Sequence, residues 1–352
     1  MKNFADKLIC AENDAYMLTS PYSIRYYTGF TGGEGIALIG SFFKILITDS
    51  RYTEAAETEA EGFKIVEKVP YHSAVSDIFE EHGIKKVYFE DAALSVSDYN
   101  KMREISGSGF DFIGASDEIE KKRSVKELWE TELIRKSEGI AVSAFEHILN
   151  YIKPGISEIE IAAELEYFMK KRGAEKTSFD TIVLSGKKTS MPHGKPDYNK
   201  INPGDFVTMD FGCVYKGYCS DMTRTVVAGK ATEEQKKVYN TVLTAQKESS
   251  MRIAAGAKAS EIDKTARDVI SGAGFGNYFG HALGHGVGLL IHEAPNLSPK
   301  SGYILEENMI LTCEPGIYIP GKFGVRIEDL LCVKQGGAVN FTPCEKKLLE
   351  IL

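Results

Sequence analysis

The stretch that decides the fold is Phe206-Val207-Thr208-Met209-Asp210-Phe211-Gly212-Cys213, followed closely by Tyr218-Cys219-Ser220-Asp221-Met222-Thr223-Arg224-Thr225-Val226-Val227. Both runs are rich in apolar and β-branched residues, which is typical of strands, and their short connection predicts an antiparallel hairpin. A turn at Tyr215-Lys216 would place Asp210 directly opposite Asp221. Opposed residues share one face of a hairpin, with Cβ atoms about 4.5–5.5 Å apart.

A second pair of carboxylates follows the same pattern. In Glu314-Pro315-Gly316-Ile317-Tyr318-Ile319-Pro320-Gly321-Lys322-Phe323-Gly324-Val325-Arg326-Ile327-Glu328, a turn centred on Gly321 places Glu314 opposite Glu328. Buried carboxylates repel one another unless they share a proton or bind a cation. A single pair would be more typical of a solvated hairpin face or an acid-pair hydrogen bond. Two pairs in strands made of Val, Ile, Leu and Phe favour a metal site.

Histidines occur in segments rich in glycine or proline, namely Pro192-His193-Gly194, His281-Ala282-Leu283-Gly284-His285-Gly286 and Ile291-His292-Glu293. Glycine lets the backbone approach a ligand closely, so these surroundings suit a binding site. His281 and His285 have the spacing of a helical zinc pair. However, the four glycines between Gly280 and Gly288 argue against a helix, and the H-E-x-x-H motif is absent.

The chemistry of these side chains indicates which metal they would bind. Four carboxylates with one or two imidazoles form an oxygen-rich set that suits Mn²⁺ or Co²⁺, with Fe²⁺ and Zn²⁺ as alternatives, and that differs from a structural thiolate zinc site. Because there are more carboxylates than one ion needs, we expect two ions, about 3.5–4 Å apart, with shared ligands. A water between them would ionise near neutral pH and become a nucleophile.

The distribution of charge and of apolar patterns divides the chain. Residues 1–120 contain 11 basic and 21 acidic residues, and residues 121–352 contain 31 and 29. In the first part, strand-length apolar runs alternate with helical spacing, which predicts an α/β domain over residues 1–120. In residues 121–352, capping boxes at Ser157-x-x-Glu160 and Thr232-x-x-Gln235, with Ser260 as a third cap, predict helices separated by groups of hairpin strands. That pattern predicts an α+β domain with an antiparallel sheet.

Composition excludes several classes of protein. The 352 residues have a net charge of −8 and are 43% hydrophobic, as in ordinary globular proteins, and the acidic balance argues against nucleic-acid or anionic-membrane binding. We expect a cytoplasmic protein, because there is no membrane-span-length apolar run and the residues from Met1 lack the apolar segment of a signal peptide. The six cysteines include no C-x-x-C pair, so we expect reduced thiols.

The order Asp210, Asp221, His285, Glu314 and Glu328, with three histidines interspersed, resembles the pita-bread metallopeptidases, specifically the prolidases (Xaa-Pro dipeptidases) and aminopeptidases P. The resemblance covers nearly the whole chain, since residues 48–52 and the following stretch are similar to the small creatinase-type N-terminal domain of those enzymes. It implies hydrolysis of the Xaa-Pro bond at the N-terminus of short peptides by a hydroxide that bridges two metal ions. It also implies a homodimer whose N-terminal domain narrows the entrance to the active site.

The resemblance implies a ligand set for the two ions. Asp221 and Glu328 would bind both ions. Asp210 would bind one ion through both oxygens, and His285 and Glu314 would bind the other.

It also implies roles around the substrate. Glu314 would carry a proton from the nucleophilic water to the leaving proline nitrogen. His193 and His292 would contact the scissile bond and stabilise the developing oxyanion, and His281 would line the pocket. Arg326 would hold the metal ligands in their orientation without binding a metal ion itself.

One segment departs from the family pattern. Some prolidases have an arginine shortly after the H-E-x-P segment that binds the free carboxylate of a dipeptide. Here His292-Glu293-Ala294-Pro295 is followed by Asn296, and no basic residue occurs until Lys300. Cleavage of Xaa-Pro peptides longer than two residues therefore remains open.

Other functions on the same fold are less consistent with the residues. Non-catalytic peptide-binding modules and metal-free creatine hydrolases of this fold have lost metal ligands, whereas all five ligand positions are filled here. Methionine aminopeptidases share the ligand set but usually lack an N-terminal domain of this kind.

Overall fold

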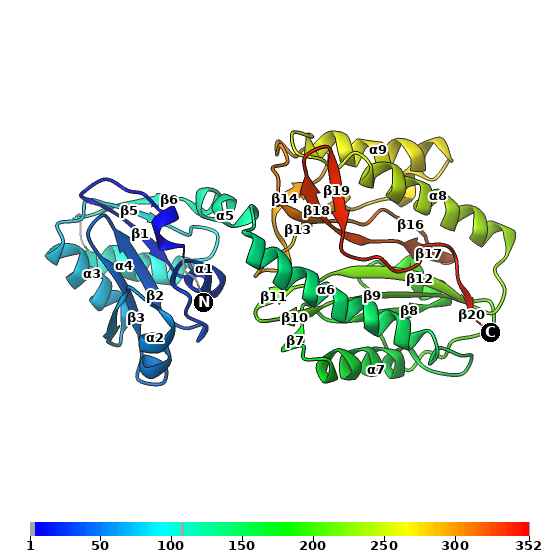
Figure 1. Ribbon diagram of the computed structural model, residues 1–352, viewed down its shortest axis with the longest axis horizontal. Coiled ribbons are helices and arrows are strands. Elements are labelled where there is room, and N and C mark those ends of the chain that lie inside the picture. The colour runs from blue at the N-terminus through cyan, green and yellow to red at the C-terminus, as the bar shows by residue number, and fades with distance from the viewer. Residues whose placement is uncertain (1–3, 107–108, 352) are drawn as a thin grey trace. The chain divides into compact units, whose positions relative to one another are not determined.

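The computed structural model describes residues 4–106 and 109–351. It divides into two compact units, Met1–Arg123 and Ser124–Leu352, which Figure 1 shows in blue to cyan and in green to red. The expectation about a signal peptide concerns in part residues 1–3, which lie outside the described residues. Within the described ranges, no helix is both long and apolar enough to cross a membrane.

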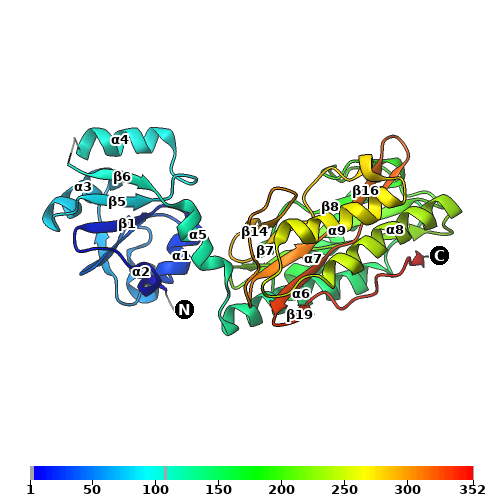
Figure 2. The same cartoon turned by 90° about the horizontal axis from the view of Figure 1, so that it is seen from above.

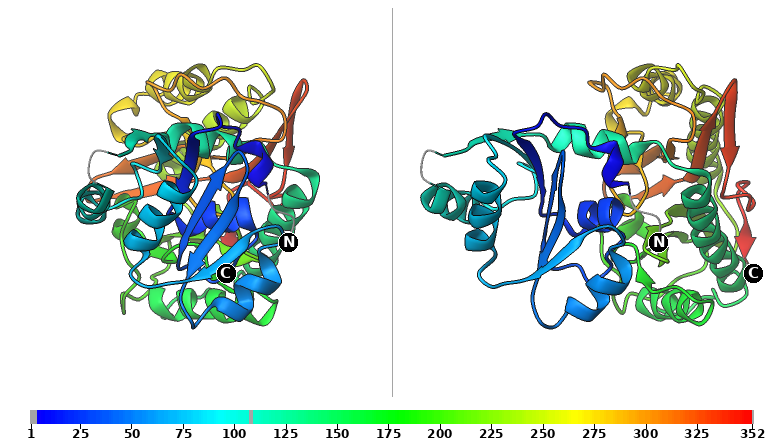
Figure 3. Two further views of the ribbon diagram at one scale, coloured as in Figure 1. Left: turned by 90° about the vertical axis from the view of Figure 1, so that its left-hand side faces the viewer. Right: turned by 60° about the vertical axis from the view of Figure 1, so that its left-hand side comes forward.

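The first unit contains a mixed sheet in the order β4-β3-β2-β1-β5-β6, whose strands run from blue to cyan in Figure 3. Its strands are β1 (Asp14–Leu18), β2 (Ile36–Gly40), β3 (Lys44–Thr48), β4 (Lys64–Glu67), β5 (Lys86–Phe89) and β6 (Asp111–Gly114). Its helices are α1 (Pro21–Thr28), α2 (Thr53–Glu59), α3 (Tyr71–Glu81), α4 (Val96–Ser106) and α5 (Ser116–Ser124). Met17 and Leu38 of the sheet form a buried core with Val75 and Phe79 of α3. The predicted α/β character of this unit is confirmed.

The second unit combines antiparallel strands with long helices. The helices are α6 (Leu128–Ile148), α7 (Glu158–Lys171), α8 (Glu233–Ser250) and α9 (Ala259–Gly272). The strands are β7 (Lys176–Thr177), β8 (Ile182–Ser185), β9 (Phe206–Phe211), β10 (Cys213–Tyr215), β11 (Tyr218–Cys219), β12 (Met222–Ala228), β13 (Gly284–Gly286), β14 (Glu293–Leu297), β15 (Ile310–Cys313), β16 (Gly316–Ile319), β17 (Phe323–Arg326), β18 (Asp329–Lys334), β19 (Gly337–Asn340) and β20 (Glu350–Ile351).

These strands form separate sheets, and a pair of helices packs against each of the two larger ones. The order β20-β12-β9-β8 defines one sheet and β14-β13-β15-β18-β19 another, with the hairpin β16-β17 and the short sheet β11-β10-β7 beside them. Helices α6 and α7 share a core with the first sheet, and α8 and α9 share a core with the second (Figures 1 and 2). The predicted α+β architecture is confirmed.

The helix starts largely follow the capping signals. Capping boxes form at Ser157 and Thr232, as predicted. The prediction that Ser260 caps a helix is wrong, because α9 already begins at Ala259 and its N-cap is Lys258. Lys258 has an extended backbone and forms an isolated bridge with Ile304, so the chain stays extended until the residue before the helix.

The first predicted hairpin forms, but its register is shifted. Asp210 lies opposite Thr223, and the expectation that it lies opposite Asp221 is wrong. The turn lies at Lys216 and Gly217, whose φ angles of 48° and 84° fit a type I′ turn, one residue later than predicted. The shift moves the partner by two residues. Asp221 lies two residues before Thr223, so its side chain is on the same strand face as that of Thr223, although β12 itself begins at Met222.

The second predicted hairpin has the expected register. Gly316 pairs with Arg326 around the turn at Gly321, and on the other side of the carboxylates Cys313 pairs with Asp329 in the same register. Glu314 and Glu328 lie between these two ladders, where the chain passes from one sheet to another.

Candidate metal centre

Carboxylates from four strand ends meet at one cavity of the second unit. Asp210 lies near the end of β9 and Asp221 just before β12, while Glu314 and Glu328 occupy the breaks that precede β16 and β18. The cavity has a volume of about 780 Å³. Its lining includes all nine residues singled out from the sequence, namely His193, Asp210, Asp221, His281, His285, His292, Glu314, Arg326 and Glu328.

These carboxylates are not on a solvated face. Asp210, Asp221 and Glu328 are 9%, 4% and 1% exposed. One ligand atom from each of Asp221, His285 and Glu328 lies within 4.8 Å of the other two. His285 Nε2 is 3.4 Å from Asp221 Oδ2 and 3.4 Å from Glu314 Oε1. The arrangement is compact enough for a single ion to contact several of these atoms.

The protonation equilibria show the electrostatic cost of this arrangement. Burial, reinforced by Glu328, holds the pKa of Asp221 well above its ordinary range, and burial with Glu314 does the same to the pKa of Glu328. Burial also raises the pKa of Glu314 to about 8, although the Arg326 guanidinium opposes that shift. Because the low-dielectric surroundings disfavour several negative charges together, the cluster requires protons or cations.

His285 points a lone pair into the cluster. Its Nδ1 lies 3.1 Å from the carbonyl oxygen of Gly286, which can only accept, so Nδ1–H donates and Nε2 is unprotonated in the neutral ring. Burial and the neighbouring His292 lower the pKa of His285 to about 4, so the ring is neutral near pH 7. A lone pair that faces two carboxylate oxygens is repulsive unless a proton or a metal cation lies between them.

Asp210 carries a further sign of a missing partner. Its Oδ2 accepts a hydrogen bond of 2.5 Å from Arg326 Nη2. Its Oδ1 is buried and has no hydrogen-bond partner among the described residues. One guanidinium cannot neutralise four carboxylates, so the residues present fit divalent metal ions bound by oxygen atoms and one imidazole nitrogen.

The other three histidines differ in their exposure and in the partners of their ring nitrogens. His281 has partners at both ring nitrogens, since Nδ1 lies 2.8 Å from the Ala282 carbonyl oxygen and Nε2 lies 2.9 Å from the Tyr318 hydroxyl. His193 and His292 are exposed at the cavity. Partial burial lowers the pKa of His292, which favours a neutral ring that can donate an N–H to a substrate oxygen.

Comparison with known proteins places this site in a family. Residues 132–335 match the model of metallopeptidase family M24, and residues 1–125 match that of the creatinase/prolidase N-terminal domain. The chain belongs to metallopeptidase family M24. The family predicted from the order of the ligand residues is thus confirmed.

Relatives of this M24 metallopeptidase align over nearly its full length. The Xaa-Pro dipeptidase of Pyrococcus furiosus is 37% identical over 355 residues, which covers 99% of this chain and 100% of that protein. The structure of an Xaa-Pro dipeptidase from Bacillus anthracis matches with a TM-score of 0.92 and 44% identity, covering 96% and 94% of the two chains. That of an X-Pro aminopeptidase from Thermotoga maritima MSB8 matches with a TM-score of 0.89 and 37% identity, covering 99% of each. The predicted pita-bread fold with a creatinase-type N-terminal domain is confirmed.

Sequence reasoning missed the hydroxyl groups that orient the carboxylates of this M24 site. Thr223 Oγ1 donates to Glu328 Oε2 at 2.6 Å, and Thr312 Oγ1 donates to Glu314 Oε1 at 3.1 Å. The Tyr318 hydroxyl accepts from Arg326 Nη1 at 2.8 Å. A signal existed for the threonines. Thr312 precedes Glu314 by two residues and Thr223 follows Asp221 by two, the spacing of one strand face.

Proposed function

We propose that the chain is a dinuclear metal-dependent peptidase that hydrolyses the Xaa-Pro bond at the N-terminus of short peptides. The observation that supports this most is the convergence of four carboxylates and the Nε2 lone pair of His285 in one cavity. The full-length similarity to Xaa-Pro dipeptidases and to an X-Pro aminopeptidase supports the choice of substrate.

The proposed metal ions are two divalent cations, Mn²⁺ or Co²⁺ in preference to Fe²⁺ or Zn²⁺. Asp221 and Glu328 would bind both ions, because they are the most buried carboxylates and the pKa of each is raised by its neighbours. Asp210 would bind one ion, which would give its buried Oδ1 a partner. His285 and Glu314 would bind the other.

When bound, the ions lower the pKa of a water and polarise the scissile carbonyl. Glu314 accepts the proton of the attacking water at a carboxylate oxygen and passes it to the departing proline nitrogen. Thr312 holds Oε1 of Glu314 in place for this transfer. The exposed imidazoles of His193 and His292 donate to the oxygen that becomes negative in the transition state.

His281 and Arg326 act less directly. Tyr318 links them, since its hydroxyl contacts His281 Nε2 and accepts from Arg326 Nη1. His281 would therefore line the pocket in a fixed orientation, and Arg326 would hold Asp210 in place. Proline at the second position fits this pocket because its amide nitrogen has no N–H that would require an acceptor.

We propose that peptides longer than two residues are substrates as well as dipeptides. Asn296 lines the cavity and directly follows Pro295, in the segment where some prolidases have an arginine that binds the carboxylate of a dipeptide. Arg326 cannot replace that cation, because its guanidinium nitrogens already contact Asp210, Tyr318 and Thr223. We further propose a homodimer, as the resemblance to the family implies, and a cytoplasmic location, as expected from the sequence.

Chelation tests this function. Removal of divalent ions should abolish hydrolysis of Xaa-Pro substrates, and Mn²⁺ or Co²⁺ should restore it. Elemental analysis at saturating metal should find two ions per chain. Full activity of the metal-free protein would contradict metal dependence, and saturation at one ion would contradict a dinuclear centre. Binding of peptides without turnover in the metal-loaded protein would favour the alternative of a peptide-binding module.

A further inference from the structure

The C-terminal segment, residues 341–351, contacts strands β12 and β18, which begin directly after Asp221 and Glu328. Its strand β20 pairs in parallel with β12, and the Val227 amide donates to the Leu349 carbonyl at 2.9 Å. The Tyr239 hydroxyl donates to the Lys346 carbonyl at 2.9 Å. The segment is therefore attached both to β12 and to helix α8.

The buried side chain of Arg224 joins this segment to Glu328. Its Nη1 donates to the main-chain carbonyl oxygen of Glu328, and its Nη2 donates to Asp329 Oδ1 at 2.8 Å. Its Nε donates to the Glu345 carbonyl at 3.2 Å. The Arg224 and Asp329 side chains are 1% and 0% exposed, so the pair is fully desolvated.

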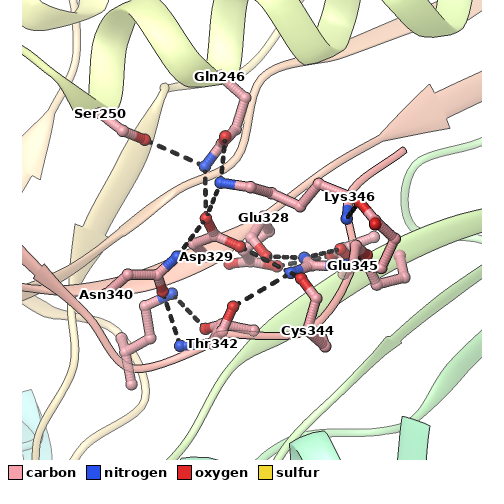
Figure 4. Close-up of polar contacts among 12 residues, drawn as sticks. Gln246, Ser250, Glu328, Asp329, Asn340, Thr342, Cys344, Glu345 and Lys346 are labelled. Carbon is pink, nitrogen blue, oxygen red and sulfur yellow. Dashed lines mark hydrogen bonds and ion pairs between the residues drawn. The ribbon is translucent and has the colours of Figure 1, made fainter. Parts of the chain in front are cut away.

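Asp329, the residue after Glu328, accepts three hydrogen bonds at its other carboxylate oxygen. Its Oδ2 accepts from Lys346 Nζ, from Gln246 Nε2 at 3.0 Å and from Asn340 Nδ2 at 2.9 Å. Figure 4 shows these side chains converging on Asp329 from α8, from the end of β19 and from the C-terminal segment. The position of Asp329 is thereby fixed from several sides.

Thr342 connects the segment to the second ligand-bearing strand end. Its hydroxyl donates to Glu138 Oε1 at 2.6 Å and accepts from the Leu330 amide at 2.8 Å. The other oxygen of Glu138 accepts from the Asp221 amide at 3.2 Å. One hydroxyl and one carboxylate thus join the main chain next to Glu328 with the main chain of Asp221.

We propose that Arg224, Asp329, Thr342 and Lys346 are positioning residues that set the affinity of the metal centre. The inference rests on the metal centre of the proposed function. Asp221 and Glu328 must converge on the same ions although β12 and β18 belong to different sheets. The Glu328 amide donates to the Thr223 carbonyl at 3.1 Å, which joins the two main chains at one point. The polar contacts through the C-terminal segment add further links between β12 and the start of β18.

Lysine substitutions separate positioning from simple charge. Lys346→Met removes a positive charge near the centre, so electrostatics alone predicts tighter binding of a cation, whereas lost positioning predicts weaker binding. Lys347→Met makes the same charge change at the next residue, whose side chain is exposed. Thr342→Val changes no charge and keeps the shape of the side chain.

The experiment is a calorimetric titration of the metal-stripped full chain with Mn²⁺. We expect Lys346→Met and Thr342→Val to weaken binding by about tenfold or more, the usual effect of losing such a supporting contact, and Lys347→Met to bind as the parent does. Hydrogen exchange of the metal-free variants should show faster exchange at the amides of residues 328–330. Equal effects of Lys346→Met and Lys347→Met, or tighter binding by Lys346→Met, would overturn the inference. A parent protein that binds Mn²⁺ but does not cleave Xaa-Pro peptides would instead overturn the proposed function alone.

Discussion

Removing the metal should make the catalytic unit less stable as the pH rises toward neutrality. The pKa of Glu314 is raised from an ordinary 4.5 to about 8 in the folded protein. Between these values the folded state holds a proton that the unfolded chain has lost. The stabilisation is therefore complete below about pH 4.5 and decreases until the pH passes about 8.

The dependence of stability on pH follows from the one proton that Glu314 retains in the folded protein. Each pH unit within that window should lower the free energy of unfolding by about 1 kcal/mol, and the fall should be clearest between about pH 6.5 and pH 7.5. Asp221 and Glu328 are shifted in the same direction and add to the slope. The lowered pKa of His285 opposes it below about pH 6.5, where the imidazole is protonated in the unfolded chain and neutral in the folded protein. Saturating Mn²⁺ should reverse the trend, because metal binding becomes stronger as the ligands lose their protons.

The single tryptophan allows this to be measured for the second unit alone. Trp129 lies in α6, with its ring 5.9 Å from that of Tyr218, so its fluorescence during urea unfolding reports on this unit. Glu314→Gln should reduce the slope by about 1 kcal/mol per pH unit. Asp268→Asn, an exposed control in α9, should leave the slope unchanged. Stability of the metal-free protein that is constant or increases between about pH 6.5 and 7.5 would refute the reasoning.

Three further predictions concern the ligands and the substrate. Asp221→Asn should reduce the metal content measured by equilibrium dialysis more than His285→Ala does, because Asp221 is expected to bind both ions; the opposite order would contradict the assigned roles. Xaa-Pro-Yaa tripeptides should be cleaved with kcat/KM within about tenfold of Xaa-Pro dipeptides, because Asn296 cannot supply a charge-assisted contact worth about 1.5–3 kcal/mol. A dipeptide preference of about a hundredfold or more would show that another cation binds the carboxylate. Arg326→Lys should lower kcat/KM by about tenfold or more, since an ammonium cannot reproduce the fork that contacts Asp210, and unchanged kinetics would exclude a positioning role.

The carboxylates could be predicted because strand alternation survives an error in register. The sequence predicts the turn one residue too early, because the left-handed conformation of Lys216 beside Gly217 is not evident from residue types alone. The error changed the partner of Asp210 by two residues, which preserves the face. The β16–β17 hairpin was predicted with its correct register because Gly321 marks its centre.

The supporting contacts could not be predicted in the same way. Arg224 and Asp329 are far apart in the chain and lie in different sheets, and their pairing depends on how those sheets pack. No periodic pattern reports such packing. Thr223 and Thr312 could have been found from their two-residue spacing to Asp221 and Glu314, but threonine is common in strands for its β-branched shape alone.

The measurement that tests the central claim most directly is kcat/KM for Ala-Pro and Ala-Ala substrates with the Mn²⁺-loaded protein, before and after chelation. We predict that Ala-Pro is cleaved at least about tenfold better than Ala-Ala, and that chelation abolishes this cleavage until metal is returned. Equal turnover of both substrates, or cleavage of Ala-Pro that persists in protein shown to be free of metal, would contradict a metal-dependent Xaa-Pro peptidase.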